Sequence, residues 1–127
     1  MTGLPVMTIL LVDDSEDCIA TLDLALQTLP GAVIRSAQSA ESALANLESG
    51  TVSAVITDVH LPEMTGLELV ARIREDPRFR SLPILVVSAD ADPSTPARAL
   101  GLGANAYFAK PFSPSAMRKK LEELIHV

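Results

Sequence analysis

The sequence has only one cysteine, Cys18, and two histidines among its 127 residues. An internal disulfide is therefore excluded, and we expect the protein to work in a reducing compartment, the cytoplasm. We expect Cys18 to be a small apolar residue on the inner face of a helix rather than a reactive thiol. The sequence also lacks the cluster of histidines and cysteines that a zinc site requires.

Basic residues are few as well. Ten lysines and arginines stand against 16 acidic residues, which gives a net charge of −6. This balance argues against a nucleic-acid-binding surface and against binding to an anionic membrane, and it favours a cationic partner or a metal ion. Long apolar runs are missing: the run from Met7 to Val12 is short and ends in two aspartates, so we expect neither a signal peptide nor a membrane-spanning helix.

Apolar residues make up 48% of the chain, which is typical of a folded domain. The length suits a single domain, residues 1–127 with a core over about residues 7–126, that needs no disulfide or structural metal. We find no linker, repeat or low-complexity segment. We expect no DNA-binding or enzymatic output domain after the last helix.

Short aliphatic stretches alternate with amphipathic ones along the whole chain, which predicts strand and helix units in alternation. Strands are expected at residues 7–13, 32–36, 53–58, 83–89 and 105–110. N-caps are expected at Ser15, Ser39, Thr65 and Ser113, and a short fourth helix at residues 94–102. The first helix is expected to extend to Leu29. The pattern predicts an α/β fold, the flavodoxin-like doubly wound (βα)5 arrangement with a parallel sheet of order 2-1-3-4-5.

Polar side chains follow four of the predicted strands. They are Asp13 and Asp14, Asp58, Ser88 and Lys110. In the predicted strand order the carboxyl ends of these strands lie side by side, at the edge where such sheets bind ligands. Two carboxylates about 4 Å apart repel by about 4 kcal/mol at an effective dielectric constant near 20, so a cation is needed there. Carboxylate oxygens without histidine or cysteine favour Mg²⁺.

These residue types also suit phosphoryl transfer, which needs an in-line nucleophile, a divalent cation and donors to the phosphoryl oxygens. Asp58 is a candidate nucleophile, because aspartyl phosphates are established covalent intermediates. Lys110 can place a positive charge on one phosphoryl oxygen, and the Ser88 hydroxyl can donate to another.

At these residues the sequence resembles the response-regulator receiver domains of two-component signalling, the CheY-like family. The matching motifs are "LVDDSED", "VITDVHLPEMTG", "VVSAD" and "YFAKPF", in the order and spacing of that family. The resemblance implies a site for Mg²⁺ (or Mn²⁺) formed by Asp13, Asp14, Asp58 and the backbone carbonyl of His60. It further implies that Asp58 accepts a phosphoryl group from a histidine of a sensor kinase or histidine phosphotransfer protein and loses it by slow autodephosphorylation. Such a protein is a phosphoacceptor and not an enzyme with a separate substrate.

The resemblance makes Ser88 and Tyr107 a switch pair, which would reshape the face formed by the fourth helix, the fifth strand and the fifth helix. That face would bind a downstream protein target, an output domain or a second phosphorylated copy. The resemblance also implies a cis Lys110–Pro111 bond. His60 and Asp90 occupy positions that tune hydrolysis of the phosphate in this family; our hypothesis is that the His60 ring hinders or orients the attacking water.

One alternative stays open, a degenerate receiver that acts as an unphosphorylated protein-interaction module. Other interpretations fit worse. The G-x-G-x-x-A pattern at Gly101 has a predicted helix before it and a strand after it, the reverse of a dinucleotide-binding unit. A calcium loop beginning at Asp13 would have Cys18 in place of its glycine. A phosphatase with an Asp-x-Asp nucleophile would need an acid where His60 stands.

Overall fold

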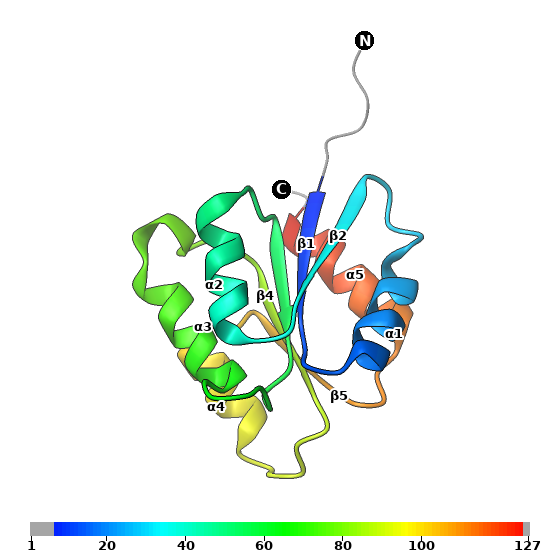
Figure 1. The fold of residues 1–127 in the computed structure, drawn as a ribbon. Coiled ribbons are helices and arrows are strands. Elements are labelled where there is room, and N and C mark those ends of the chain that lie inside the picture. The colour runs from blue at the N-terminus through cyan, green and yellow to red at the C-terminus, as the bar shows by residue number, and fades with distance from the viewer. Residues whose placement is uncertain (1–6, 126–127) are drawn as a thin grey trace.

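The structure, a computed structural model, describes residues 7–125, so position 126 at the end of the predicted core lies outside the described residues. The strands are β1 (Met7–Val12), β2 (Ala32–Ala37), β3 (Ala54–Thr57), β4 (Ile84–Ser88) and β5 (Ala106–Ala109). They form a parallel sheet of order β2-β1-β3-β4-β5, which confirms the predicted topology (Figure 1).

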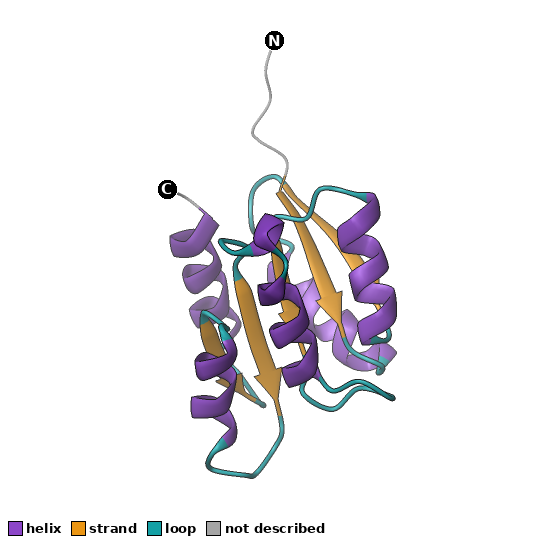
Figure 2. Cartoon of the chain, turned by 90° about the vertical axis from the view of Figure 1, so that its left-hand side faces the viewer, coloured by secondary structure: helices purple, strands orange, loops and turns teal. Residues whose placement is uncertain are grey.

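Helices cover both faces of this sheet (Figures 1 and 2). The helices are α1 (Glu16–Leu26), α2 (Ala40–Ser49), α3 (Gly66–Glu75), α4 (Thr95–Leu102) and α5 (Pro114–Ile125), with a short 3₁₀ helix, η1 (Pro77–Phe79). Helices α1 and α5 lie on one face, and α2, α3 and α4 lie on the other, as Figure 1 shows. None of these helices, within residues 7–125, is long and apolar enough to cross a membrane.

The expected helix caps are present. The side chains of Ser15, Ser39 and Ser113 each accept a hydrogen bond from a backbone N–H of the first turn that follows. Thr65 and Glu68 form a reciprocal capping box at the start of α3. Helix α4 differs, because its N-cap residue, Ser94, makes no side-chain cap bond.

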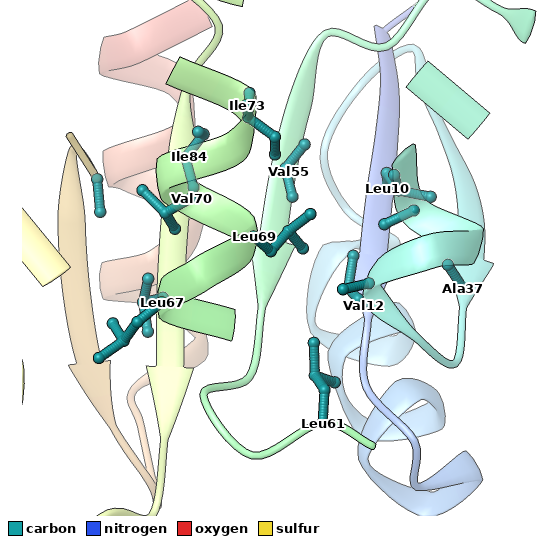
Figure 3. Packing of buried hydrophobic residues seen from close by; sticks show 14 of the residues in the cluster. Leu10, Val12, Ala37, Val55, Leu61, Leu67, Leu69, Val70, Ile73 and Ile84 are labelled. Atoms are coloured by element: carbon teal, nitrogen blue, oxygen red, sulfur yellow. The ribbon is translucent and has the colours of Figure 1, made fainter. Parts of the chain in front are cut away.

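Successive side chains of a strand point to opposite faces of the sheet. The central strands are buried on both sides because helices cover both faces. On β1, Leu10 and Val12 pack toward α2 and α3, whereas Ile9 and Leu11 pack toward α1 and α5. Figure 3 shows the first of these layers, where side chains of α3 such as Leu69 meet those of the strands beneath. This packing fixes the strand ends relative to one another.

The predicted extent of the first helix is wrong. Helix α1 ends at Leu26, and Leu29 lies in the turn that follows, although it is buried against the same core as the helix. Leu29 precedes Pro30, and a residue before proline is disfavoured in the helical conformation. Gly31 then adopts φ 76°, which reverses the chain into β2. The 3₁₀ helix η1 was not predicted either.

Candidate functional site

Three aspartates meet where β1 and β3 end, at the lower edge of the sheet in Figure 1. The two strands lie side by side in register, Val12 opposite Thr57, and the Asp58 N–H donates to the Val12 carbonyl at 3.0 Å. One carboxylate oxygen from each of Asp13, Asp14 and Asp58 lies within 4.8 Å of the others. The structure thus brings together residues that are up to 45 positions apart in sequence, as expected.

Asp13 and Asp58 use their oxygens in the same way. The Oδ1 atom of Asp13 accepts the Ser15 N–H at 2.9 Å, and Oδ1 of Asp58 accepts the Val59 N–H at 2.7 Å. The two Oδ2 atoms face the Lys110 ammonium, at 3.2 Å from Asp13 and 3.6 Å from Asp58. Backbone N–H groups therefore orient both carboxylates, and the second oxygen of each faces the lysine, where it can bind a cation or react.

Lys110 reaches these aspartates from the end of β5, across the end of β4. Its backbone N–H donates to the Ser88 carbonyl at 2.9 Å, and the Lys110–Pro111 peptide bond is cis, as the family resemblance implies. Burial lowers the pKa of Lys110, but the negative charges of Asp58 and Asp13 and the hydrogen bond to Asp13 more than offset burial, and the pKa lies above its ordinary value. The raised pKa favours the charged form of the side chain in the site.

Ser88 is fully buried at the end of β4. Its Oγ accepts the Asp90 N–H at 3.1 Å, which leaves its own hydroxyl proton free to be donated. Asp90 in turn faces His60: Nε2 of His60 and Oδ2 of Asp90 are 3.6 Å apart, and the His60 side chain is 67% exposed. The loops after β3 and β4 therefore meet at the rim of the site.

Tyr107 lies on β5 opposite Val86, two pairs before the Ser88–Ala109 pair. Paired residues of parallel strands project to the same face, so Tyr107 and Ser88 share a face of the sheet. The Tyr107 ring is half-buried against the core beneath α2, α3 and α4. It is thus a neighbour of the site and not part of its polar cluster.

Cys18 lies beside the site, which its sequence position did not predict. The residue is half-buried, and its sulfur accepts a hydrogen bond from Nζ of Lys110 at 3.5 Å. A cavity of about 270 Å³ opens beside this contact, lined by Asp17, Cys18, Thr21, Leu22, Lys110, Pro111, Phe112 and Pro114. Cys18 and Lys110 are 92 positions apart, so helical spacing alone gave no signal of the contact.

The donor set suits a hard divalent cation. Mg²⁺ binds oxygen ligands at about 2.0–2.1 Å, so ligands on opposite sides of one ion stand about 4 Å apart. One carboxylate oxygen from each of Asp13, Asp14 and Asp58 lies within 4.8 Å of the others, so a small rotation of the side chains brings them to the ligand distances of one ion. Asp14 is exposed enough to leave room for water ligands. The cluster therefore fits Mg²⁺ or Mn²⁺.

Comparison with known proteins identifies the family of the chain. A family model for the response regulator receiver domain matches residues 9–122. The chain is 33% identical over 120 residues to the chemotaxis protein CheY1 of Helicobacter pylori, covering 94% of this chain and 97% of the relative. It is also 33% identical over 118 residues to the chemotaxis protein CheY of Pseudomonas aeruginosa, covering 93% of this chain and 95% of the relative.

Solved structures show the same fold. The chemotaxis response regulator CheY4 of Vibrio cholerae superimposes with a TM-score of 0.83 at 28% identity, covering 94% of this chain and 99% of that one. The signal receiver domain of an HD domain-containing protein from Pseudomonas fluorescens gives a TM-score of 0.87 at 31% identity, covering 98% of this chain and 90% of that one. The chain therefore belongs to the response regulator receiver domains, the CheY-like signalling domains of two-component systems.

Proposed function

We propose that this receiver domain accepts a phosphoryl group on Asp58 in a reaction that requires Mg²⁺ or Mn²⁺. The observation that carries the proposal is the pair of contacts made by Asp58: Oδ1 accepts the Val59 N–H, and Oδ2 faces Lys110 at 3.6 Å. Oδ2 is therefore the free nucleophilic oxygen. It lies beside a fixed cation that can hold the incoming phosphoryl group.

The donor is a phosphohistidine of a sensor kinase or a histidine phosphotransfer protein. Oδ2 of Asp58 attacks phosphorus while the P–N bond of the donor breaks, and its electron pair returns to the imidazole nitrogen. Asp13, Asp14, Asp58 and the backbone carbonyl of His60 would hold the divalent cation, which neutralises negative charge on the phosphoryl oxygens when bound. Lys110 binds one phosphoryl oxygen, and the Ser88 hydroxyl donates to another.

Phosphorylation then changes the surface of the domain. The Ser88 hydroxyl moves toward the phosphoryl group, the Tyr107 ring turns inward, and the face of α4, β5 and α5 is reshaped for a protein target, an output domain or a second copy of the chain. The state ends when water attacks phosphorus, which regenerates the Asp58 carboxylate and releases phosphate. His60 and Asp90 at the rim tune this slow step. We place the protein in the cytoplasm with its kinase partner.

Intact mass measurement tests the proposal. Incubation with MgCl₂ and acetyl phosphate should add the mass of one phosphoryl group to the parent protein. The addition should be absent from Asp58→Ala and from parent protein treated with chelator, and present in Asp23→Ala, a control carboxylate on α1. An unlabelled parent protein would contradict the proposal and favour an unphosphorylated interaction module. Label on Asp58→Ala would contradict the assignment of Asp58 as the acceptor.

A further inference from the structure

The carboxylate of Asp90 joins segments that come from different parts of the chain. Its Oδ2 accepts the Thr95 hydroxyl at 3.1 Å and lies 3.6 Å from Nε2 of His60. Its Oδ1 accepts the Asp92 N–H at 2.9 Å. The backbone N–H of Asp90 donates to the Ser88 hydroxyl oxygen at 3.1 Å. One residue therefore contacts the end of β4, the loop after β3 and the start of α4.

Thr95 is the first residue of α4 and is 0% exposed. The cap residue before it, Ser94, makes no side-chain cap bond, and the Ser94 N–H, the Ser94 hydroxyl and the Thr95 N–H all donate to Asp92. The Thr95 hydroxyl attaches this helix end to Asp90 as well. A hydroxyl bound to a carboxylate belongs to the stronger class of hydrogen bonds, because one partner is charged. The Asp90 side chain is 21% exposed, which shields the bond from most competing water.

The other end of α4 is attached differently. The Gly103 carbonyl accepts Nε of Arg74 at 2.9 Å, and Arg74 also donates to the Phe79 carbonyl at 2.6 Å. This guanidinium ties the end of α4 to α3, far from the residues of the site. The start of α4 is thus tied to the site, and its end is tied to a neighbouring helix.

We propose that Asp90 and Thr95 are positioning residues that connect the Ser88 hydroxyl to the start of α4. The inference rests on the proposed function, in which Ser88 moves toward a phosphoryl group on Asp58. The Asp90 N–H is bonded to the oxygen that moves, so the loop after β4 follows Ser88. The Asp90 carboxylate then moves the Thr95 hydroxyl and the first turn of α4, while the Gly103 end stays fixed.

Thr95→Val and Thr95→Ser form a matched pair for the test. Valine keeps the shape of threonine and removes the hydroxyl, whereas serine keeps the hydroxyl. The measurement is amide hydrogen exchange in the first turn of α4, including the Arg98 N–H that donates to the Ser94 carbonyl. It is made with and without Mg²⁺ and beryllium fluoride, a phosphoryl mimic whose binding is followed by fluorine NMR.

In the parent protein and Thr95→Ser, the mimic should change exchange in this turn. In Thr95→Val, exchange should be about tenfold faster before the mimic is added, as expected for the loss of one hydrogen bond to a charged acceptor. Binding of the mimic should then add less than a twofold change. Asp90→Ala removes the other partner of the bond, together with the acceptor of the Asp92 N–H, so its effect should be at least as large. Adding Thr95→Val to Asp90→Ala should have no further effect.

The results of these experiments distinguish a failure of the coupling from a failure of the proposed function. If the mimic bound to Thr95→Val and changed amide exchange in the first turn of α4 as much as in the parent protein, the coupling alone would be overturned. Additive effects of Thr95→Val and Asp90→Ala would also overturn it, because residues that act through one bond are not independent. If the mimic failed to bind the parent protein, both the coupling and the proposed function would be overturned.

Discussion

Gly66 packs directly against the backbone of Asp58: a Cβ atom at position 66 would stand 1.8 Å from the Asp58 carbonyl oxygen. The Gly66 N–H also donates to the Val59 carbonyl at 2.7 Å. Helix α3, which begins at Gly66, is thereby pressed onto the residue that we propose to be phosphorylated. Only glycine allows this approach, since every other residue carries a Cβ.

Gly66→Ala should therefore destabilise the domain by about 3 kcal/mol, because backbone has to move to relieve the overlap. Urea unfolding measures the free energy change. Gly101→Ala is the matched control: it lies in α4 with nothing within 4 Å of the added Cβ, and it should stabilise the domain by about 0.5–1 kcal/mol. Equal effects of the two substitutions would contradict the packing described.

Magnesium should stabilise the folded domain without any phosphodonor. At about five times the dissociation constant, a ligand that binds only the folded state adds about 1 kcal/mol, which raises the melting temperature by about 4 °C. Asp13→Asn should lose this rise, and Asp23→Asn on α1 should keep it. Differential scanning calorimetry at constant ionic strength measures it. A rise of the same size with KCl in place of MgCl₂ would show that screening, and not a site, is responsible.

Lys110→Gln should affect metal binding and phosphorylation in opposite directions. The parent lysine is charged throughout the neutral and mildly alkaline range, because its pKa lies above the ordinary value. Removing this charge beside Asp13 and Asp58 should tighten Mg²⁺ binding by about tenfold. It should slow phosphorylation by about a hundredfold at saturating Mg²⁺, because one phosphoryl oxygen loses its cation. Calorimetric titration and acetyl phosphate kinetics measure the two effects; a change of both in the same direction would refute this role of Lys110.

His60→Ala should shorten the lifetime of the phosphorylated state. The ring is held toward Asp90 at the rim of the site, where it can obstruct the approach of water. We expect hydrolysis to be about threefold faster, an effect of about 0.7 kcal/mol on the barrier. The decay of phosphorylated protein is followed by intact mass, with Glu75→Ala on α3 as an exposed control. An unchanged lifetime would leave His60 with its backbone carbonyl as its sole contribution.

Arg74→Met should lower the stability of the domain by about 2 kcal/mol. The substitution keeps an apolar stem but removes the hydrogen bonds to the Gly103 and Phe79 carbonyls and to the Asn105 side chain. The exposed neighbour Arg72→Met should change stability by less than about 0.5 kcal/mol. Chemical unfolding measures the free energy of unfolding of both variants. If the two variants were equally stable, water would replace the hydrogen bonds of Arg74 without loss of stability.

Sequence patterns predicted the strands, their order and the aspartates at their ends. Apolar runs mark the strands locally, and the strand order then places the polar residues that follow them at one edge of the sheet. They did not predict contacts that depend on side-chain reach, such as Cys18 with Lys110 or Thr95 with Asp90. Nor did they predict η1, where Asp76 caps a single turn that begins at proline. Such short elements lack the periodicity that makes a helix visible in sequence.

Lys110 sits at the end of an edge strand, yet it contacts a carboxylate at the end of β1, with the ends of β3 and β4 between them. Its side chain thus connects the half of the sheet that contains β1 and β3 to the half that contains β4 and β5. A phosphoryl group on Asp58 would carry more negative charge than the carboxylate and would hold this lysine more firmly. Resistance to unfolding would then rise and fall with the signalling state, so that the two halves of the domain separate less readily while the signal lasts.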